Sequence, residues 1–180
     1  MLEVELKVKI PSLDPVRIAL VNRQADFLGR VHEHDIYYNA PHRDFGITDE
    51  AVRVRYTNDH AVVTYKGPKI KKYGLKAREE LNFGVESGKD FETMLNRLGF
   101  RKTTDVNKWR ETYRFSGATI SLDSVEELGT YAEIEVIVRD ADDNPTEMIG
   151  RIAEEIGASG EPILASYLEL LLEKRSAAPS

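Results

Sequence analysis

The chain has 180 residues, of which 41% are hydrophobic and 31% charged, as is typical of one globular domain with many charges. It contains no cysteine, which excludes disulfides and thiolate metal sites and favours a reducing compartment. A net charge of −6 argues against nucleic acid as a partner, and no apolar run approaches the roughly 20 residues of a membrane span. We therefore expect one cytoplasmic domain over residues 1–175, with no membrane contact, and a disordered tail at residues 176–180.

Alternating apolar and polar residues dominate the sequence. Residues 2–10 alternate with period two at nine positions, which predicts a strand. Similar patterns predict strands at residues 33–39, 51–57, 60–67, 75–83, 104–116, 118–124 and 130–139. Asn58-Asp59 and Ser116-Gly117 are tight-turn pairs between such runs, so we expect antiparallel hairpins.

Four helices are predicted between or after the strands, at residues 14–28, 89–98, 145–156 and 167–174. The pairs Asp14-Pro15 and Asn144-Pro145 favour helix starts, and a glycine follows each of the first three helices. The last helix carries a run of leucines, which indicates core packing or a contact in a homodimer.

Strong charges lie at alternate positions of nearly every predicted strand. These positions are Glu3, Glu5, Lys7 and Lys9; Arg53 and Arg55; Lys66; Lys76, Arg78 and Glu80; Lys108, Arg110 and Arg114; and Glu133 and Glu135. A solvated sheet face would explain one such strand. Six together indicate a common charged side, because the apolar sides must pack against the helices. A sheet of about eight strands can close on itself, so that these charges line a barrel wide enough for a small ligand.

Cations and carboxylates crowded into one cavity require pairing or a charged ligand. A metal-bound triphosphate matches this mixture, because Arg and Lys bind phosphate oxygens while carboxylates hold a hard divalent cation. The pattern therefore predicts a triphosphate-binding barrel.

Seven segments, taken in chain order, resemble the motifs of a known family. The first is Glu3-Val4-Glu5-Leu6-Lys7, and the others lie at residues 34–39, 48–55, 64–68, 78–80, 108–110 and 122–135. Together they resemble the CYTH superfamily, the triphosphate tunnel metalloenzymes, over about residues 1–174. The Thr48-Asp49-Glu50-Ala51 segment and the run that begins at Ser166-Tyr167 look most like the class IV adenylyl cyclase branch.

The resemblance implies an α+β fold, in which a closed eight-stranded antiparallel β-barrel forms the tunnel and helices pack outside. It implies that Mg²⁺ or Mn²⁺ is held, directly or through water, by Glu3, Glu5, Asp123, Glu133 and Glu135. It implies triphosphate contacts from Lys7, Lys9, Arg53, Arg55, Lys66, Arg78, Lys108 and Arg110, and strand phase alone adds Arg114. Tyr37 and Lys66 match a pair that activates water in some hydrolase members, so they are the predicted catalytic residues.

For several other conspicuous residues the sequence indicates no catalytic or binding role. Asn39 stands where the family usually has Asp, and we assign it no role. The four histidines lack metal-ligand spacing, and Trp109 is expected to pack outward against a helix. Lys69, Lys71 and Lys72 form a basic loop that is either solvated or a gate over phosphate.

Two reactions fit the predicted tunnel. An adenylyl cyclase converts ATP to cyclic AMP and pyrophosphate, and the resemblance to the class IV branch makes it our preferred hypothesis. The alternative is a triphosphatase that hydrolyses inorganic tripolyphosphate or thiamine triphosphate. A third hypothesis is a non-catalytic polyphosphate- or nucleotide-binding protein, which missing metal ligands would favour.

Overall fold

The computed structural model describes residues 2–58, 60–70, 75–138 and 144–177. Its strands are β1 (Leu2–Lys9), β2 (Asp26–Asn39), β3 (Ala51–Thr57), β4 (His60–Lys66), β5 (Lys76–Val85), β6 (Arg101–Phe115), β7 (Ala118–Val125) and β8 (Gly129–Val138). Its helices are α1 (Asp14–Asn22), α2 (Phe45–Thr48), α3 (Gly88–Arg97), α4 (Pro145–Ile156) and α5 (Tyr167–Ala177).

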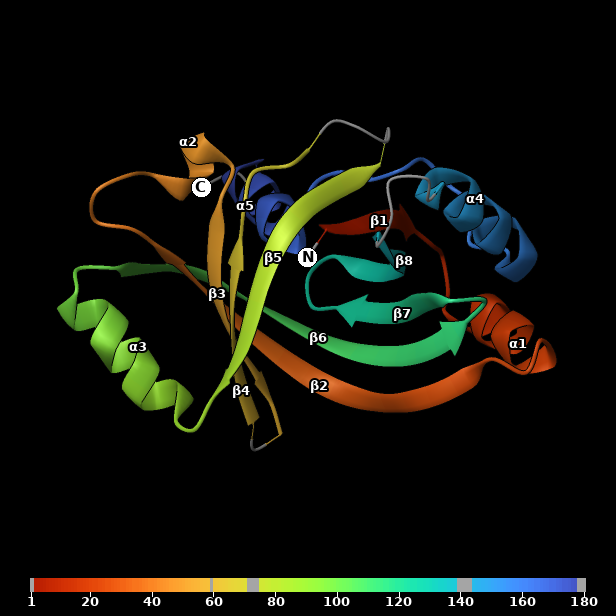
Figure 1. The fold of residues 1–180 in the computed structure, drawn as a ribbon, viewed down its shortest axis with the longest axis horizontal. Coiled ribbons are helices and arrows are strands. Elements are labelled where there is room, and N and C mark those ends of the chain that lie inside the picture. Colours follow the sequence, from red (N-terminus) through yellow and green to blue (C-terminus); the bar gives the residue numbers. More distant parts are fainter. Residues whose placement is uncertain (1, 59, 71–74, 139–143, 178–180) are drawn as a thin grey trace.

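The strands form a closed antiparallel barrel in the order β1-β5-β4-β3-β2-β6-β7-β8. Pairing of β1 with β8 completes the closure, and Figure 1 shows the helices outside the curved sheet. The predicted α+β barrel is therefore confirmed.

The two faces of the strands differ as their alternation predicts. On β1, Val4 and Val8 are buried outside the barrel, whereas Lys7 between them lines its interior. The register sets Glu5 opposite Glu135 and Lys7 opposite Glu133. Because residues opposite one another in an antiparallel pair share a face, charges from neighbouring strands meet inside the barrel.

Apolar packing outside the barrel holds the helices in place. The helix α4 packs against β1 and β8, where Ile149, Ile152 and Ile156 join the outer side chains of both strands in the largest buried cluster. A second cluster places Leu171 of α5 against Val106 of β6, and a third places Leu95 of α3 against β2, β3 and β4. The apolar sides of the strands thus face the helices, which leaves the charged sides for the interior.

Two helix predictions need correction, and one helix was not predicted. The first helix ends at Asn22, because Gln24 adopts a positive φ of 55°, and residues 26–28 belong to β2 instead. The short helix α2 was not predicted; Asp44 caps it by accepting a hydrogen bond from the Gly46 amide. The last helix runs to Ala177, so Ser176 and Ala177 are helical and not part of a tail.

Some predictions fall on residues that are not described, namely Asp59 of one turn, Lys71 and Lys72 of the basic loop, and residues 178–180. Among the described helices, none has the length and apolarity needed to cross a membrane.

Candidate functional site

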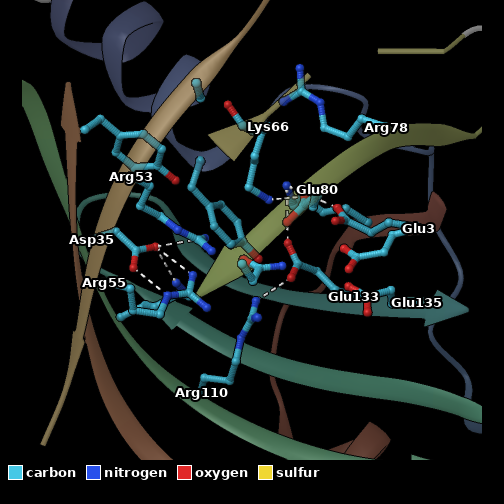
Figure 2. A pocket seen from close by; sticks show the side chains of 18 residues that line it. Glu3, Asp35, Arg53, Arg55, Lys66, Arg78, Glu80, Arg110, Glu133 and Glu135 are labelled. Carbon is cyan, nitrogen blue, oxygen red and sulfur yellow. Dashed lines mark hydrogen bonds and ion pairs between the residues drawn. The ribbon is translucent and has the colours of Figure 1, made fainter. Parts of the chain in front are cut away.

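A cavity of about 260 Å³ lies inside the barrel (Figure 2). Nearly every strand contributes side chains to it, and most of them are charged. The lining residues are Glu3, Glu5, Lys7, Asp35, Tyr37, Ala51, Arg53, Arg55, Lys66, Arg78, Glu80, Asn82, Lys108, Arg110, Glu133, Glu135, Ser166 and Tyr167. The strand alternation has therefore gathered cations and carboxylates from distant parts of the chain into one space.

One side of the cavity is a paired network centred on Asp35 of β2. Arg55 donates to both oxygens of Asp35, over 2.6 and 2.8 Å, and Lys108 donates to the same carboxylate over 3.0 Å. Lys108 also lies 2.7 Å from Glu33. Burial alone would raise the pKa of Asp35, but Lys108 and the two arginines of β3 hold it well below its usual range. We call Glu33, Asp35, Arg55 and Lys108 the paired network.

The opposite side is a cluster of carboxylates, which Figure 2 shows for Glu3, Glu133 and Glu135. Glu5 of β1 completes the cluster, because it lies directly across from Glu135 of β8. Burial, followed by repulsion from the other three, raises the pKa of Glu135 to about 7. Burial also raises the pKa of Glu3, with further repulsion from Glu80. We call Glu3, Glu5, Glu133 and Glu135 the carboxylate cluster.

The carboxylate cluster has the chemistry of a divalent-metal site. Carboxylate oxygens are the ligands that Mg²⁺ and Mn²⁺ prefer, and like charges held this close gain from a cation between them. Within the described residues, however, no three of these carboxylates converge closely enough to form a complete ligand set. The donor set fits a hard cation, and binding one would require the carboxylate oxygens to move closer together.

Two cations connect the carboxylate cluster to the rest of the wall. Lys7 lies 3.3 Å from Glu133 and donates to the Ala165 carbonyl over 3.1 Å. Arg110 also pairs with Glu133, and its Nε donates to Asp123 over 2.7 Å. These contacts leave Glu133 more neutralised than Glu3 and Glu135.

Two buried arginines retain an unpartnered donor. Arg53 donates to Thr64 through Nη2 over 2.9 Å, and Arg78 donates to the Asp49 carbonyl through Nη2 over 2.8 Å. The Nε atoms of both arginines are buried and have no hydrogen-bond partner in the described structure. A buried donor without an acceptor is costly, so both positions favour an anion in the cavity.

The predicted catalytic pair, Tyr37 and Lys66, lines the same cavity. Lys66 donates to Glu80, which fits a charged ammonium. Burial, followed by the nearby charge of Asp35, raises the pKa of the Tyr37 phenol, so this group is protonated at neutral pH. This arrangement favours binding and orientation of an anion over proton abstraction by either residue.

The structure brings most predicted site residues together and leaves three apart. The cavity is lined by Glu3, Glu5, Lys7, Tyr37, Arg53, Arg55, Lys66, Arg78, Lys108, Arg110, Glu133 and Glu135. Lys9 and Arg114 are exposed and outside it, because each two-residue step along a strand moves a side chain by about 7 Å. Asp123 is fully buried behind the wall, where it accepts from Arg110 and from the Tyr167 hydroxyl over 2.9 Å.

Sequence reasoning missed several functional candidates. Asp35 lines the cavity and lay within a segment that resembled a family motif, whereas Glu80 had been placed on the charged side of its strand without a specific role. Glu33 shares the phase of Asp35 on β2, so alternation could have identified it. Tyr167 lay in the run that resembled the class IV branch, but strand alternation could not place it in the cavity, because it lies on α5 and reaches the cavity through the packing of that helix.

Asn39, Trp109 and Lys69, to which the sequence assigned no catalytic role, make contacts within the fold. Asn39 accepts from the Phe45 amide over 2.8 Å and thereby fixes the entry to α2. Trp109 is half exposed and packs against Arg30 and His32, not against a helix as expected. Lys69 lies 2.7 Å from Glu169 of α5 and 2.9 Å from Asp49, so it is paired and not freely solvated.

Comparison with known proteins agrees with this architecture. The family model described as the CYTH domain matches residues 1–161. A Methanocaldococcus jannaschii protein named "Putative adenylate cyclase MJ0240" is 37% identical over 173 residues, which cover 94% of this chain and 98% of the relative.

Solved structures that resemble the barrel include the following two. The PH1819 protein from Pyrococcus horikoshii OT3 has a structure that matches this one with a TM-score of 0.85. Its sequence is 40% identical, and the match covers 96% of this chain and 99% of the PH1819 chain. A Hippeastrum protein described as a "putative adenylyl cyclase" with "a dominant triphosphatase activity" is 18% identical, has a TM-score of 0.72 and covers 96% of each chain. The second likeness supports the fold alone.

Proposed function

We propose, on the premise that this chain belongs to the CYTH domain family, that it is a metal-dependent enzyme that binds a triphosphate inside its barrel. The preferred reaction is that of an adenylyl cyclase, and hydrolysis of tripolyphosphate or thiamine triphosphate is the alternative.

The observation that carries this proposal is the division of charge within one cavity. Arg53 and Arg78 line the same cavity as the carboxylate cluster, and the buried Nε atom of each has no hydrogen-bond partner among the described residues. Phosphate oxygens would satisfy the guanidinium donors, while a divalent cation would relieve the repulsion between the carboxylates. A metal-bound triphosphate supplies both charges at once, whereas a simple anion or a simple cation supplies only one.

We propose that Mg²⁺ or Mn²⁺ is held by Glu3, Glu5 and Glu135, and that Glu133 lies next to the ion. When bound, the ion neutralises phosphate charge as the reaction proceeds. Lys7, Arg53, Arg55, Lys66, Arg78, Lys108 and Arg110 then orient the phosphate chain from the remaining strands. Lys9, Arg114 and Asp123 are left out of these proposed roles because they do not line the cavity.

The contacts of Lys66 and Tyr37 support the cyclase hypothesis. In a hydrolase of the kind that Tyr37 and Lys66 resemble, this pair would activate the attacking water, but Lys66 is paired with Glu80 and the Tyr37 phenol is kept protonated. In a cyclase these groups only position the phosphates. The 3′-hydroxyl of the substrate would form the new bond to the α-phosphorus and give its proton to water, while the bond from the α-phosphorus to the bridging oxygen breaks and pyrophosphate leaves with its electrons.

Identification of the products decides between the reactions. The protein should be incubated with ATP, tripolyphosphate and thiamine triphosphate in the presence of Mg²⁺ or Mn²⁺. We expect cyclic AMP and pyrophosphate from ATP. Formation of ADP and orthophosphate, with no cyclic AMP, would establish the triphosphatase alternative instead.

The variant Lys66→Ala gives a second test of the same choice. If Lys66 only holds phosphate, the variant should need more ATP to reach half its maximal rate and should still form cyclic AMP. Collapse of the maximal rate, with orthophosphate as the lost product, would contradict this role. The matched control is Lys9→Ala on β1, since Lys9 is exposed and outside the cavity.

A further inference from the structure

The strand β5 extends past its neighbour β1. Their described register ends at the pair of Leu2 with Glu79, whereas the pairing of β5 with β4 continues to Val85. Within the described part of the chain, residues 82–85 therefore pair with β4 alone. Figure 1 shows this part of β5 running toward α3, away from β1. Its backbone edge on the side opposite β4 is open to another strand.

The backbone hydrogen bonds show which residues point to the open edge. Gly67, directly after β4, donates its amide to the Glu79 carbonyl over 3.0 Å. The N–H and C=O groups of one residue point to the same side of an antiparallel strand, and successive residues alternate. Glu79 and the other odd-numbered residues of β5 thus bond to β4, whereas Asn82 and Gly84 direct both backbone groups to the open edge. Such a row of backbone groups is a template for pairing with another chain.

The side chains of this edge do not protect it from pairing. Proteins commonly blunt an exposed edge with lysine, another charge or proline, and residues 81–85 contain none of these. Because Asn82 lines the cavity, Leu81 and Phe83 lie on the outer face, where they are 51% and 50% exposed. The Phe83 ring lies 6.3 Å from that of Phe91 on α3. The open edge thus has an apolar outer surface that a further strand would cover.

We infer that this edge pairs with the same edge of a second copy of the chain, as two antiparallel strands related by a two-fold axis at Phe83. In this register Asn82 of each copy lies opposite Gly84 of the partner subunit. Residues opposite one another at such positions exchange two hydrogen bonds, so every N–H and C=O group on the open edge gains an acceptor or a donor. On the outer face, Phe83 lies opposite Phe83 of the partner subunit, and Leu81 lies opposite Val85 of the partner subunit.

The sequence of the edge is complementary to itself only in this register. An axis at Asn82 would set Val85 opposite a glutamate, Glu79, and an axis at Leu81 would set Phe83 opposite the same glutamate. With the axis at Phe83, apolar side chains face apolar side chains throughout the outer face, and aromatic and aliphatic cross-strand pairs of this kind stabilise a sheet. A two-fold axis uses the same patch on both copies, so the strand supplies its own complement.

The leucines of α5 were the other candidates for a homodimer contact. Leu171 is 1% exposed, and Leu168 and Leu170 pack against the same buried cluster. Only Leu172, at 46% exposed, is left as a large apolar contact from this run. The open edge of β5 is therefore the better interface, and its pairing does not depend on the proposed function, because neither Leu81 nor Phe83 lines the cavity.

The test measures the mass of the protein by light scattering during size-exclusion chromatography, over a series of concentrations. We expect the unmodified protein to have the mass of two chains. Phe83→Lys places two like charges opposite one another at the axis and should give the mass of one chain. The matched control is Phe27→Lys on β2, since Phe27 is 57% exposed and its ring contacts that of Tyr113. This control should keep the mass of two chains.

A second variant separates loss of pairing from loss of folding. Gly84→Pro removes an N–H group that points to the open edge and not to β4, and no atom lies within 4 Å of a Cβ added there. It should also give the mass of one chain, whereas Leu172→Lys on α5 should keep the mass of two. Thermal melting checks that each variant is folded.

Hydrogen exchange locates the contact. The amides of Asn82 and Gly84 should exchange more slowly in the unmodified protein than in Phe83→Lys, because pairing protects them. An unmodified protein with the mass of one chain would overturn the inference. A dimer that survives both Phe83→Lys and Gly84→Pro, or that Leu172→Lys separates, would overturn it as well.

Discussion

The buried charges on the two sides of the tunnel are compensated to different degrees. In the paired network, Asp35 and Glu33 are each neutralised by Arg55 and Lys108, and the pKa of Asp35 is strongly lowered. In the carboxylate cluster, Glu135 faces Glu5 across β1 and β8, and its pKa is raised to about 7.

The two sides differ in how far their charges depend on a ligand for compensation. The paired network is complete without a ligand, so it can stabilise the barrel by itself. The carboxylate cluster costs stability as it stands, because opposed like charges destabilise a strand pair. Charged groups that lower the stability of the folded protein are expected at sites that bind a ligand. The predictions below test this division.

The largest effect should follow from breaking the paired network. Asp35→Asn keeps the shape of the side chain but leaves Glu33 as the one carboxylate of the network that Arg55 and Lys108 still share, and loss of one partner of a buried ion pair costs about 3–5 kcal/mol. Urea denaturation measures the change. The control is Asp14→Asn in the exposed pair with Arg17, which should cost less than about 1 kcal/mol. Equal effects of the two variants would show that the network has no special structural role.

The opposite behaviour is expected from the carboxylate cluster. The double variant Glu3→Gln with Glu5→Gln should remain folded and lose metal-dependent turnover, because both side chains keep their shape but lose their anionic ligands. We expect metal to bind at least about 100-fold more weakly, more than the 10–100-fold typical of residues that only support a ligand. Unchanged turnover at limiting Mg²⁺ would remove these residues from the metal site.

A bound triphosphate should stabilise the folded protein. At about 100 times its dissociation constant a ligand adds roughly 2.7 kcal/mol to the free energy of unfolding. Tripolyphosphate should therefore raise the melting temperature more than orthophosphate does at equal ionic strength. Equal shifts would point to general screening of charge and against a tunnel site.

A smaller effect should come from Glu135→Gln in metal-free protein. The pKa of Glu135 is about 7 in the fold against 4.5 as the ordinary value, so its contribution to stability is fully present below about pH 4.5. It is lost as pH rises through 7, because the charged form is disfavoured in the fold. The variant should therefore be more stable than the unmodified protein at pH 8, by roughly 1–3 kcal/mol, and equal to it near pH 4.5.

Thermal melts in EDTA across this pH range provide the measurement, with the exposed Glu161→Gln as control. A variant that loses stability with rising pH as steeply as the unmodified protein contradicts the assignment.

Period-two alternation by itself determined which side of each strand is charged. Because successive side chains of a strand must point to opposite faces, Glu3, Arg53 and Lys108 could be placed in one interior from the sequence alone. Alternation showed only that a sheet of about eight strands can close on itself, and the resemblance to the CYTH superfamily implied the closed barrel.

Alternation carries no information about position along the barrel axis or about partners. Lys9 and Arg114 have the right phase, yet they lie beyond the cavity. Strand register decides that Asp35 contacts Arg55 and Lys108 and that Asp123 is buried behind Arg110. Helix packing decides that a smaller hollow lies between α2 and α5, beside the tunnel cavity. These contacts join residues far apart in the chain, so only the tertiary structure decides them.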